Sequence, residues 1–313
     1  MDDQLLTRPT TSESVTTHSP WHTARYLLKA MRPRQWVKNG FVYAALLFDA
    51  KLLETSLLLR TTAAFFLFAL LSSAVYLMND LADIEADRLH PVKRNRPLAS
   101  GKLSPRLALV ACVLFIVLSL PAAFWLDWRF GVVALTYLVV QIAYSFWLKH
   151  VVLVDIFIGA AGFVLRVAAG VIIAHARNFS PWLYLTVTLG ALFIFIGKRR
   201  HELTLLQGNA ISHRKILAQY NLRLLDDMMN LVTSSTAVTY SFYTFSAPNL
   251  PPNHLMMLTI PFVLYGIFRY QYLIHVRGEG GSPDELVLKD KPLLVDFALW
   301  LLVVILVLYV VPA

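Results

Sequence analysis

Residues 58–87 read LLRTTAAFFLFALLSSAVYLM and then NDLADIEAD, so a long apolar run leads directly into an acidic one. About 17–25 apolar residues suffice to cross a bilayer as a helix, so we expect a span that ends in carboxylates. At about 100° per residue, Asp80, Asp83 and Asp87 would share one helical face and repel one another unless a cation lies among them. Carboxylate oxygens suit Mg²⁺ that also holds substrate phosphates. The alternative is a solvated acidic helix end, which the membrane setting disfavours.

The composition of the whole chain is typical of a membrane protein. Hydrophobic residues make up 57% of the 313 residues and charged residues 15%, and the mean hydropathy of +0.59 excludes an ordinary soluble domain. We therefore expect an all-α integral membrane protein with nine spans, the first of them weakened by Asp49 and Lys51. The predicted spans are residues 36–53, 58–78, 106–126, 129–148, 151–174, 181–197, 229–247, 254–274 and 293–312.

The distribution of Lys and Arg predicts the orientation of these spans. Residues 1–39, 80–106 and 198–227 contain six such residues each, whereas the four connections on the other side share only Lys51, Arg60, Arg129 and Arg177. Because basic loops stay inside, we expect the N-terminus and the acidic run at the cytoplasmic face of the cell membrane and the C-terminus outside. The formal charge of +9 suits anionic lipids and anionic substrates, and no nucleic-acid motif accompanies it.

The N-terminal end is expected to lie outside the membrane. Residues 1–20 are too polar to pack and predict a disordered tail, and they lack the apolar run of a signal peptide. Residues 21–30 mix apolar and basic side chains, which is typical of a short interfacial helix. Residues 21–313 are expected to form a single domain. The only cysteine, Cys112, excludes an intrachain disulfide.

Basic side chains follow or precede the spans in every long cytoplasmic connection. Taken singly they are ordinary topology signals. Gathered around three carboxylates, they resemble a cradle for a substrate with several phosphates, because Arg offers a planar fork and Lys a mobile point charge. The candidates for phosphate contacts are Lys38, Lys93, Arg96, Lys198 and Arg199, with Asn39 and Asn79 beside them.

A second group of candidates lies on the fourth and fifth spans. Ionisable groups inside a span are costly and usually functional, so Asp155 and Arg166 are candidate site residues. Eleven residues separate them, about 16 Å along a helix, so they are not expected to pair directly. Arg166 can instead be a structural partner of a buried carbonyl or carboxylate. Gly159 and Gly162 leave room for a neighbouring helix or a ligand. Tyr144 and Lys149 precede this group in the sequence.

Four motifs together resemble one family. They are RPRQWVKN (32–39), NDLADIEADRLHPVKRNRPLASG (79–101), YSFWLKHVVLVD (144–155) and GKRRHEL (197–203). The chain resembles the UbiA-type intramembrane prenyltransferase superfamily, and within it the phosphoribosyltransferases that act on polyprenyl (decaprenyl) phosphate. The resemblance covers about residues 30–313. It implies nine helices around a central cavity that opens to the cytoplasm, and transfer of 5-phosphoribose from phosphoribosyl diphosphate to the lipid phosphate for cell-wall arabinan.

The chain departs from the wider superfamily in one respect. Aromatic prenyltransferases usually carry a second Asp-rich motif, whereas residues 198–227 offer Lys198, Arg199 and Arg200 and an isolated Asp226–Asp227 pair. This difference favours a single metal-bound diphosphate and a second substrate held by basic residues, which a polyprenyl monophosphate satisfies.

The resemblance assigns roles to the candidate residues. Asp80, Asp83 and Asp87 would hold Mg²⁺ on the diphosphate, and Asp155 would contact ribose hydroxyls or a metal-bound water. The lipid phosphate is already anionic, so no strong base is required. The remaining substrate-binding candidates are Lys38, Asn39, Asn79, Lys93, Arg96, Tyr144, Lys149, Arg166, Lys198 and Arg199.

Two other functions stay open on the sequence. One is a prenyltransferase that joins a prenyl diphosphate to an aromatic or isoprenoid acceptor. The other is a transporter with Asp155 and Arg166 lining its path, although no internal duplication accompanies it. Small-residue helix faces also permit homo-oligomers.

Overall fold

The computed structural model describes residues 20–89, 93–176, 179–205, 215–279, 286 and 289–311, and every regular element in these ranges is helical. The predicted tail, apart from Pro20, and most of the loop 282–292 lie outside the described residues. The larger helices are α1 (Pro20–Ala30), α3 (Thr55–Ala82), α5 (Pro105–Leu126), α6 (Trp128–Phe146), α7 (Val154–Ile173), α8 (Pro181–Leu205), α10 (Leu222–Ser246), α11 (Ile260–His275) and α13 (Lys291–Ile305). The shorter ones are η1 (Pro33–Tyr43), α2 (Ala44–Phe48), α4 (Ile84–Leu89), η2 (Lys93–Asn95), η3 (Leu148–His150), η4 (Lys215–Gln219), η5 (Leu255–Thr259) and η6 (Leu306–Val310).

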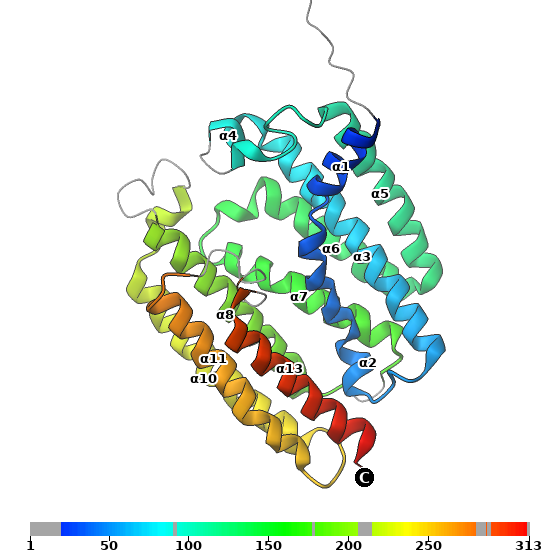
Figure 1. Cartoon of the computed structure of the whole chain (residues 1–313), viewed down its shortest axis with the longest axis vertical. Helices are drawn as coiled ribbons and strands as arrows, with labels where there is room; N and C mark the ends of the chain where they lie inside the picture. The colour runs from blue at the N-terminus through cyan, green and yellow to red at the C-terminus, as the bar shows by residue number, and fades with distance from the viewer. Residues whose placement is uncertain are drawn as a thin grey trace, which may run out of the picture.

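The long helices form two groups that meet at α7. Helices α3, α5 and α6 lie on one side, and α8, α10, α11 and α13 lie on the other (Figure 1). Helix α7 contacts both α6 and α8, and so joins the groups. Helix α4 lies at the end of the molecule opposite the C-terminus (Figure 1).

Local sequence explains where several spans begin. Ser104 precedes Pro105, and its hydroxyl accepts a hydrogen bond from the Leu107 amide at the start of α5. Asp127 caps α6 by accepting from the Arg129 amide, and Asn221 caps α10 by accepting from Leu224. These short polar side chains satisfy helix amides that would otherwise lack partners.

Among the described residues, seven helices are long and apolar enough to cross a membrane. The outer face of α5 illustrates the environment they require. Val110, Val113 and Val117 are 63%, 52% and 59% exposed, so an apolar stripe runs along the outside of the bundle. Such a surface is unfavourable in water and suits the lipid tails of a bilayer. The chain is thus a multi-pass membrane protein.

Two of the nine predicted spans differ from ordinary apolar helices. The first, 36–53, is wrong as a continuous helix, because the chain forms the 3₁₀ helix η1 and then the short α2, which ends at Phe48. Eleven 3₁₀ residues and five α-helical ones extend about 30 Å, since a 3₁₀ helix rises about 2.0 Å per residue. The seventh is the helix α10, but α10 is not among the seven candidate spans.

Candidate active site

The acidic run lies where α3 ends and α4 begins. Helix α3 ends at Ala82, Asp83 is its C-cap residue with φ −103° and ψ 11°, and α4 starts at Ile84. The prediction that the three aspartates share one face of a continuous helix is therefore wrong. The break at Asp83 turns the chain, so Asp80 and Asp87 approach each other from different helices.

Two arginines hold Asp80 and Asp87 together. Arg96 Nη1 lies 3.1 Å from Asp80 Oδ1 and 2.6 Å from Asp87 Oδ2. Arg32 Nη2 lies 2.5 Å from the same Asp80 oxygen. Asp80 and Asp87 are only 2% and 3% exposed. Because buried carboxylates are unfavourable without partners, these guanidinium groups offset the cost of burying them.

Asp83 points to a different cation. Its Oδ1 lies 3.8 Å from Lys149 Nζ of η3, and its side chain is 40% exposed. Lys93 Nζ lies 4.0 Å from Asp87 Oδ1 on the other side. We call the three carboxylates and their four partners, Arg32, Lys93, Arg96 and Lys149, the acidic cluster.

The acidic cluster suits one hard cation that shares ligands with a substrate. Within the described ranges, no three His, Cys, Asp or Glu side chains gather closely enough to form a metal cage. Asp80 and Asp87 nevertheless converge on one cationic atom, Arg96 Nη1. Mg²⁺ is usually bound by one or two carboxylates together with waters and substrate phosphates, so two converging carboxylates fit this ion.

A second buried cluster forms around Asp155 at the start of α7. Arg199 Nη2 of α8 lies 2.5 Å from Asp155 Oδ2, and the Tyr220 hydroxyl donates to Asp155 Oδ1 at 2.6 Å. Arg199 also pairs with Glu202 one turn later. Burial raises the pKa of Tyr220, and its hydrogen bond to Asp155 adds to this, so the phenol stays a donor. Asp155, Arg199, Glu202 and Tyr220 are called the Asp155 cluster below.

A short strained segment connects the two clusters. Lys149 belongs to the acidic cluster, and Leu153 donates its backbone N–H to the Tyr220 hydroxyl at 2.7 Å. Leu153 has φ 67° and ψ −42°, a region that non-glycine residues rarely occupy. The predicted motif 144–155 is therefore the chain segment that reaches both clusters. Tyr144 lies close enough to Arg199 to interact with its charge.

Arg166 has a structural set of partners. It donates from Nε to Asn39 Oδ1 at 2.7 Å, from Nη1 to the Gly162 carbonyl at 2.6 Å, and from Nη2 to the Tyr137 hydroxyl at 3.1 Å. Of the two structural partners considered from the sequence, a buried carbonyl or a carboxylate, the structure has the carbonyl, and a substrate contact by Arg166 stays a prediction. Asn39 and Arg166 thus attach η1 to α7, while the amide nitrogen Nδ2 of Asn39 is buried without a hydrogen-bond partner in the described part of the chain.

The other predicted residues lie near these groups. Lys38 Nζ donates to Gln35 Oε1 at 2.5 Å and lies near the Tyr137 side chain. Asn79 is half-buried in the last turn of α3, and Lys198 is half-buried beside Arg199. Gly159 makes room for a neighbouring helix, since a Cβ there would lie 2.3 Å from the Phe195 ring.

Three side chains that bond to candidate site residues were not predicted from the sequence. Arg32 lies in the motif 32–39 but had no assigned partner, and Tyr137 and Tyr220 are single aromatic residues without a distinguishing pattern. Their partners, Asp80, Arg166 and Asp155, are 48, 29 and 65 residues away. Residues this far apart in the sequence are paired by the tertiary fold, which no local pattern reveals.

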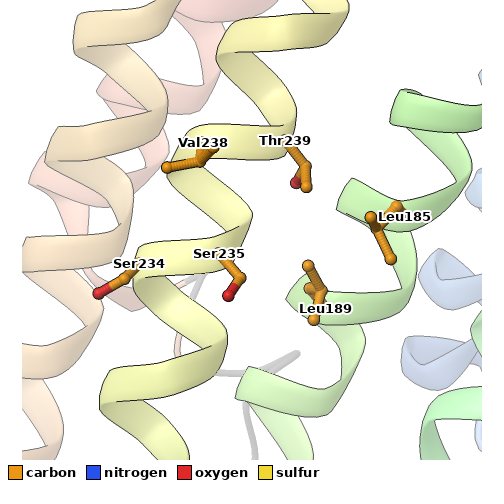
Figure 2. Close-up of a pocket in the computed structure, with 6 residues that line it drawn as sticks. All are labelled: Leu185, Leu189, Ser234, Ser235, Val238 and Thr239. Atoms are coloured by element: carbon orange, nitrogen blue, oxygen red, sulfur yellow. The ribbon is translucent and has the colours of Figure 1, made fainter.

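A separate groove of about 470 Å³ lies between α8 and α10 (Figure 2). Figure 2 shows Leu185 and Leu189 on α8 facing Ser235 and Thr239 on α10. None of the predicted site residues lines it. The groove is thus separate from both clusters in its lining residues.

Comparisons with known proteins identify the family and the fold. The chain matches the UbiA prenyltransferase family over residues 40–280. It is 36% identical over 294 residues to the decaprenyl-phosphate phosphoribosyltransferase of Mycolicibacterium smegmatis, covering 88% of this chain and 90% of that protein. The decaprenyl-phosphate phosphoribosyltransferase of Mycobacterium tuberculosis is 34% identical over 294 residues, covering 93% of this chain and 96% of that protein.

The fold is similar to that of solved UbiA homologues. A UbiA homologue from Archaeoglobus fulgidus, bound to GPP and Mg²⁺, gives a TM-score of 0.71 at 20% identity, covering 91% of this chain and all of that chain. At that identity the likeness shows the fold alone. The resemblance seen in the four motifs is confirmed by the family match and by relatives matched along most of their length. The chain belongs to the UbiA prenyltransferase family.

Proposed function

We propose that this protein transfers 5-phosphoribose from phosphoribosyl diphosphate to a polyprenyl phosphate, releasing diphosphate, for the synthesis of cell-wall arabinan precursors. Its curated relatives at 33–36% identity are named decaprenyl-phosphate phosphoribosyltransferases. The observation that carries the proposal is the contrast between the clusters. The acidic cluster offers carboxylates that can share a metal ion with a diphosphate, whereas the Asp155 cluster offers the buried Arg199, whose Nε has no hydrogen-bond partner among the described residues.

The acidic cluster is proposed to bind the diphosphate of the donor. Asp80 and Asp87 would hold Mg²⁺, which would neutralise charge on the leaving diphosphate. Asp83 would be the third carboxylate of the set, and its backbone N–H donates to the Asn79 carbonyl. Lys93 and Arg96 already reach these carboxylates and can hold further phosphate oxygens.

The Asp155 cluster is proposed to serve the rest of the substrates. Asp155 and Glu202 hold the guanidinium of Arg199, and its Nε has no hydrogen-bond partner among the described residues, so this N–H can orient an anionic group. Lys198 and Tyr144 lie beside it. The nucleophile is an oxygen of the lipid phosphate, which is ionised at neutral pH, so these residues position reactants rather than remove a proton. Lys38 and Lys149 supply further positive charge.

An activity assay tests this proposal. Purified protein in detergent is incubated with labelled phosphoribosyl diphosphate, a polyprenyl phosphate and Mg²⁺, with and without a chelator. We expect lipid-linked phosphoribose that disappears with the chelator. Asp83→Ala should lower the rate about 100-fold or more, as loss of an electrostatic group at a reacting centre does. Glu85→Ala is the matched control, because Glu85 is exposed and pairs only with Arg88 among the ion pairs described. Absence of labelled lipid would overturn the proposal.

The second candidate function is prenyl transfer to an aromatic or isoprenoid acceptor. It is favoured by the shared fold with a UbiA homologue bound to GPP and Mg²⁺. The same assay separates the two, because labelled geranyl diphosphate would then yield product and phosphoribosyl diphosphate would not.

The nine crossings and their orientation are also part of the proposal. The length of about 30 Å reached by η1 and α2 supports a first crossing, and the 25 residues of α10 suffice for another. With the basic loops inside, the central cavity would open to the cytoplasm. In a Cys112→Ala background, Ser100→Cys should react with an impermeant thiol reagent only from the cytoplasmic side, and Ala50→Cys only from outside. The reverse pattern would contradict the orientation.

A further inference from the structure

Arg32 occupies an oxygen that the proposed metal would need. Its Nη2 lies 2.5 Å from Asp80 Oδ1, and its guanidinium carbon lies 4.8 Å from the centre of the Tyr76 ring. Its backbone has φ 55° and ψ 61°, the left-handed conformation, at the junction between α1 and η1. This turn aims the side chain at the end of α3. Arg32 therefore competes directly with any cation that binds Asp80.

The acidic cluster already has more cationic side chains than carboxylates. Its three carboxylates face the four cationic side chains of Arg32, Lys93, Arg96 and Lys149. A free divalent cation would approach carboxylates whose oxygens are already bound by two guanidinium groups, so its attraction is small. A metal ion that arrives on a diphosphate brings excess negative charge. The same guanidinium groups then attract it.

We propose that Arg32 and Arg96 make the acidic cluster select a metal–diphosphate complex over the free metal ion. This inference rests on the proposed function of the acidic cluster. Without ligand, the two side chains are counterions of Asp80 and Asp87. When the complex binds, they exchange these carboxylates for diphosphate oxygens, which their planar forks fit equally well. The Arg32 and Arg96 side chains are 30% and 27% exposed, so they can turn toward a ligand that enters from solvent. The two carboxylates are buried and keep their positions.

Metal binding can be measured without any transfer reaction. We would titrate the substrate-free protein with Mn²⁺ by electron paramagnetic resonance, with and without inorganic diphosphate, and subtract the signal of Asp80→Asn/Asp87→Asn. Wild type should bind free Mn²⁺ weakly and gain affinity with diphosphate. Arg32→Ala should bind free Mn²⁺ about tenfold more tightly, equivalent to ~1.4 kcal/mol, and lose most of the gain from diphosphate. These opposite effects are the signature of exchange.

Two further variants serve as controls. Arg32→Gly accepts the left-handed backbone without steric strain and should behave as Arg32→Ala does. Arg34→Ala removes an exposed arginine two residues away and should match wild type. If both Arg32 variants bind free Mn²⁺ no more tightly than wild type, the inference is wrong and Arg32 is only structural. That outcome is independent of the proposed function, which the transfer assay tests with a different readout.

Discussion

Arg199 Nη2 lies 2.5 Å from Asp155 Oδ2, and the two side chains are among the most buried charged groups in the described structure, at 3% and 0% exposed. Removing one partner of such a pair leaves an uncompensated charge in the interior. We expect Asp155→Ala to lower the free energy of unfolding by about 3–5 kcal/mol. Thermal unfolding in detergent, followed by tryptophan fluorescence, measures this change.

The double variant Asp155→Leu/Arg199→Met separates stability from function. Replacing a buried pair with apolar side chains of similar size is often nearly neutral. Because Tyr220 and Glu202 also lose a partner, the stability of the double variant should lie between those of Asp155→Ala and wild type. Its transferase activity should be lost, because Arg199 no longer orients a phosphate. A stable double variant with full activity would show that the pair has no place in the reaction.

Asn39 is predicted to tolerate a carboxylate but not an apolar side chain. Asn39→Leu removes the acceptor for Arg166 Nε and should lower stability by about 1.5–3 kcal/mol, the usual value for a hydrogen bond to a charged group. Asn39→Asp keeps an acceptor and removes the buried amide nitrogen that lacks a partner, so its melting temperature should be at least that of wild type. If Asn39→Asp is stable but inactive, the amide nitrogen contacts a substrate.

Gly170 is predicted to be intolerant of any side chain. A Cβ at this position would lie 2.1 Å from the Val42 carbonyl oxygen of η1, so Gly170→Ala must push η1 away from α7. We expect a loss of about 1–3 kcal/mol, as for other overpacked sites. Gly190→Ala is the control in α8, since nothing lies within 4 Å of its added Cβ. The control should gain about 0.5–1 kcal/mol from lower backbone entropy. Equal melting temperatures for the two variants would argue against a tight η1–α7 contact.

Asp290 is predicted to give the protein a pH-dependent contact outside the spans. Its carboxylate accepts from Arg269 at 2.8 and 3.1 Å and from the Leu293 amide at 3.0 Å, and the hydrogen bonds from Arg269 hold its pKa below the usual value. A pKa lowered by folding means that the contact stabilises the protein above the ordinary aspartate pKa of about 3.9 and that this stabilisation is lost as the pH falls further.

The variant Asp290→Asn tests this sign. Its melting temperature should be lower than that of wild type at pH 7, and the difference should shrink as the pH falls below about 4. Glu85→Gln removes an exposed pair with Arg88 and should change little at any pH. A difference that grows on acidification would contradict the assignment.

Much of the fold follows from local sequence. Seven apolar runs became helices with the expected character, because a span needs only length and hydropathy. The first span did not, because residues 33–43 wind as a 3₁₀ helix held by contacts such as the Arg166–Asn39 hydrogen bond. Those contacts come from residues more than 100 positions away, which no local pattern contains.

The sequence predicted which types of side chain form the site, but not which of them pair with one another. The acidic and basic residues were visible as motifs, but the break at Asp83 was not, since the sequence through Ile84 and Glu85 has no proline or glycine. Tertiary contacts also decided that Arg166 is bonded to Gly162 and Tyr137. Charge patterns therefore located the site, and packing selected the partners within it.

The strained segment between Lys149 and Asp155 sets an upper limit on the reach of the site. Six residue steps of chain span at most about 20–22 Å even when fully extended, and part of this segment is helical. Lys149 and Asp155 therefore cannot move apart beyond this length. Any motion that widens the distance between the two clusters has to unwind η3 or the first turn of α7.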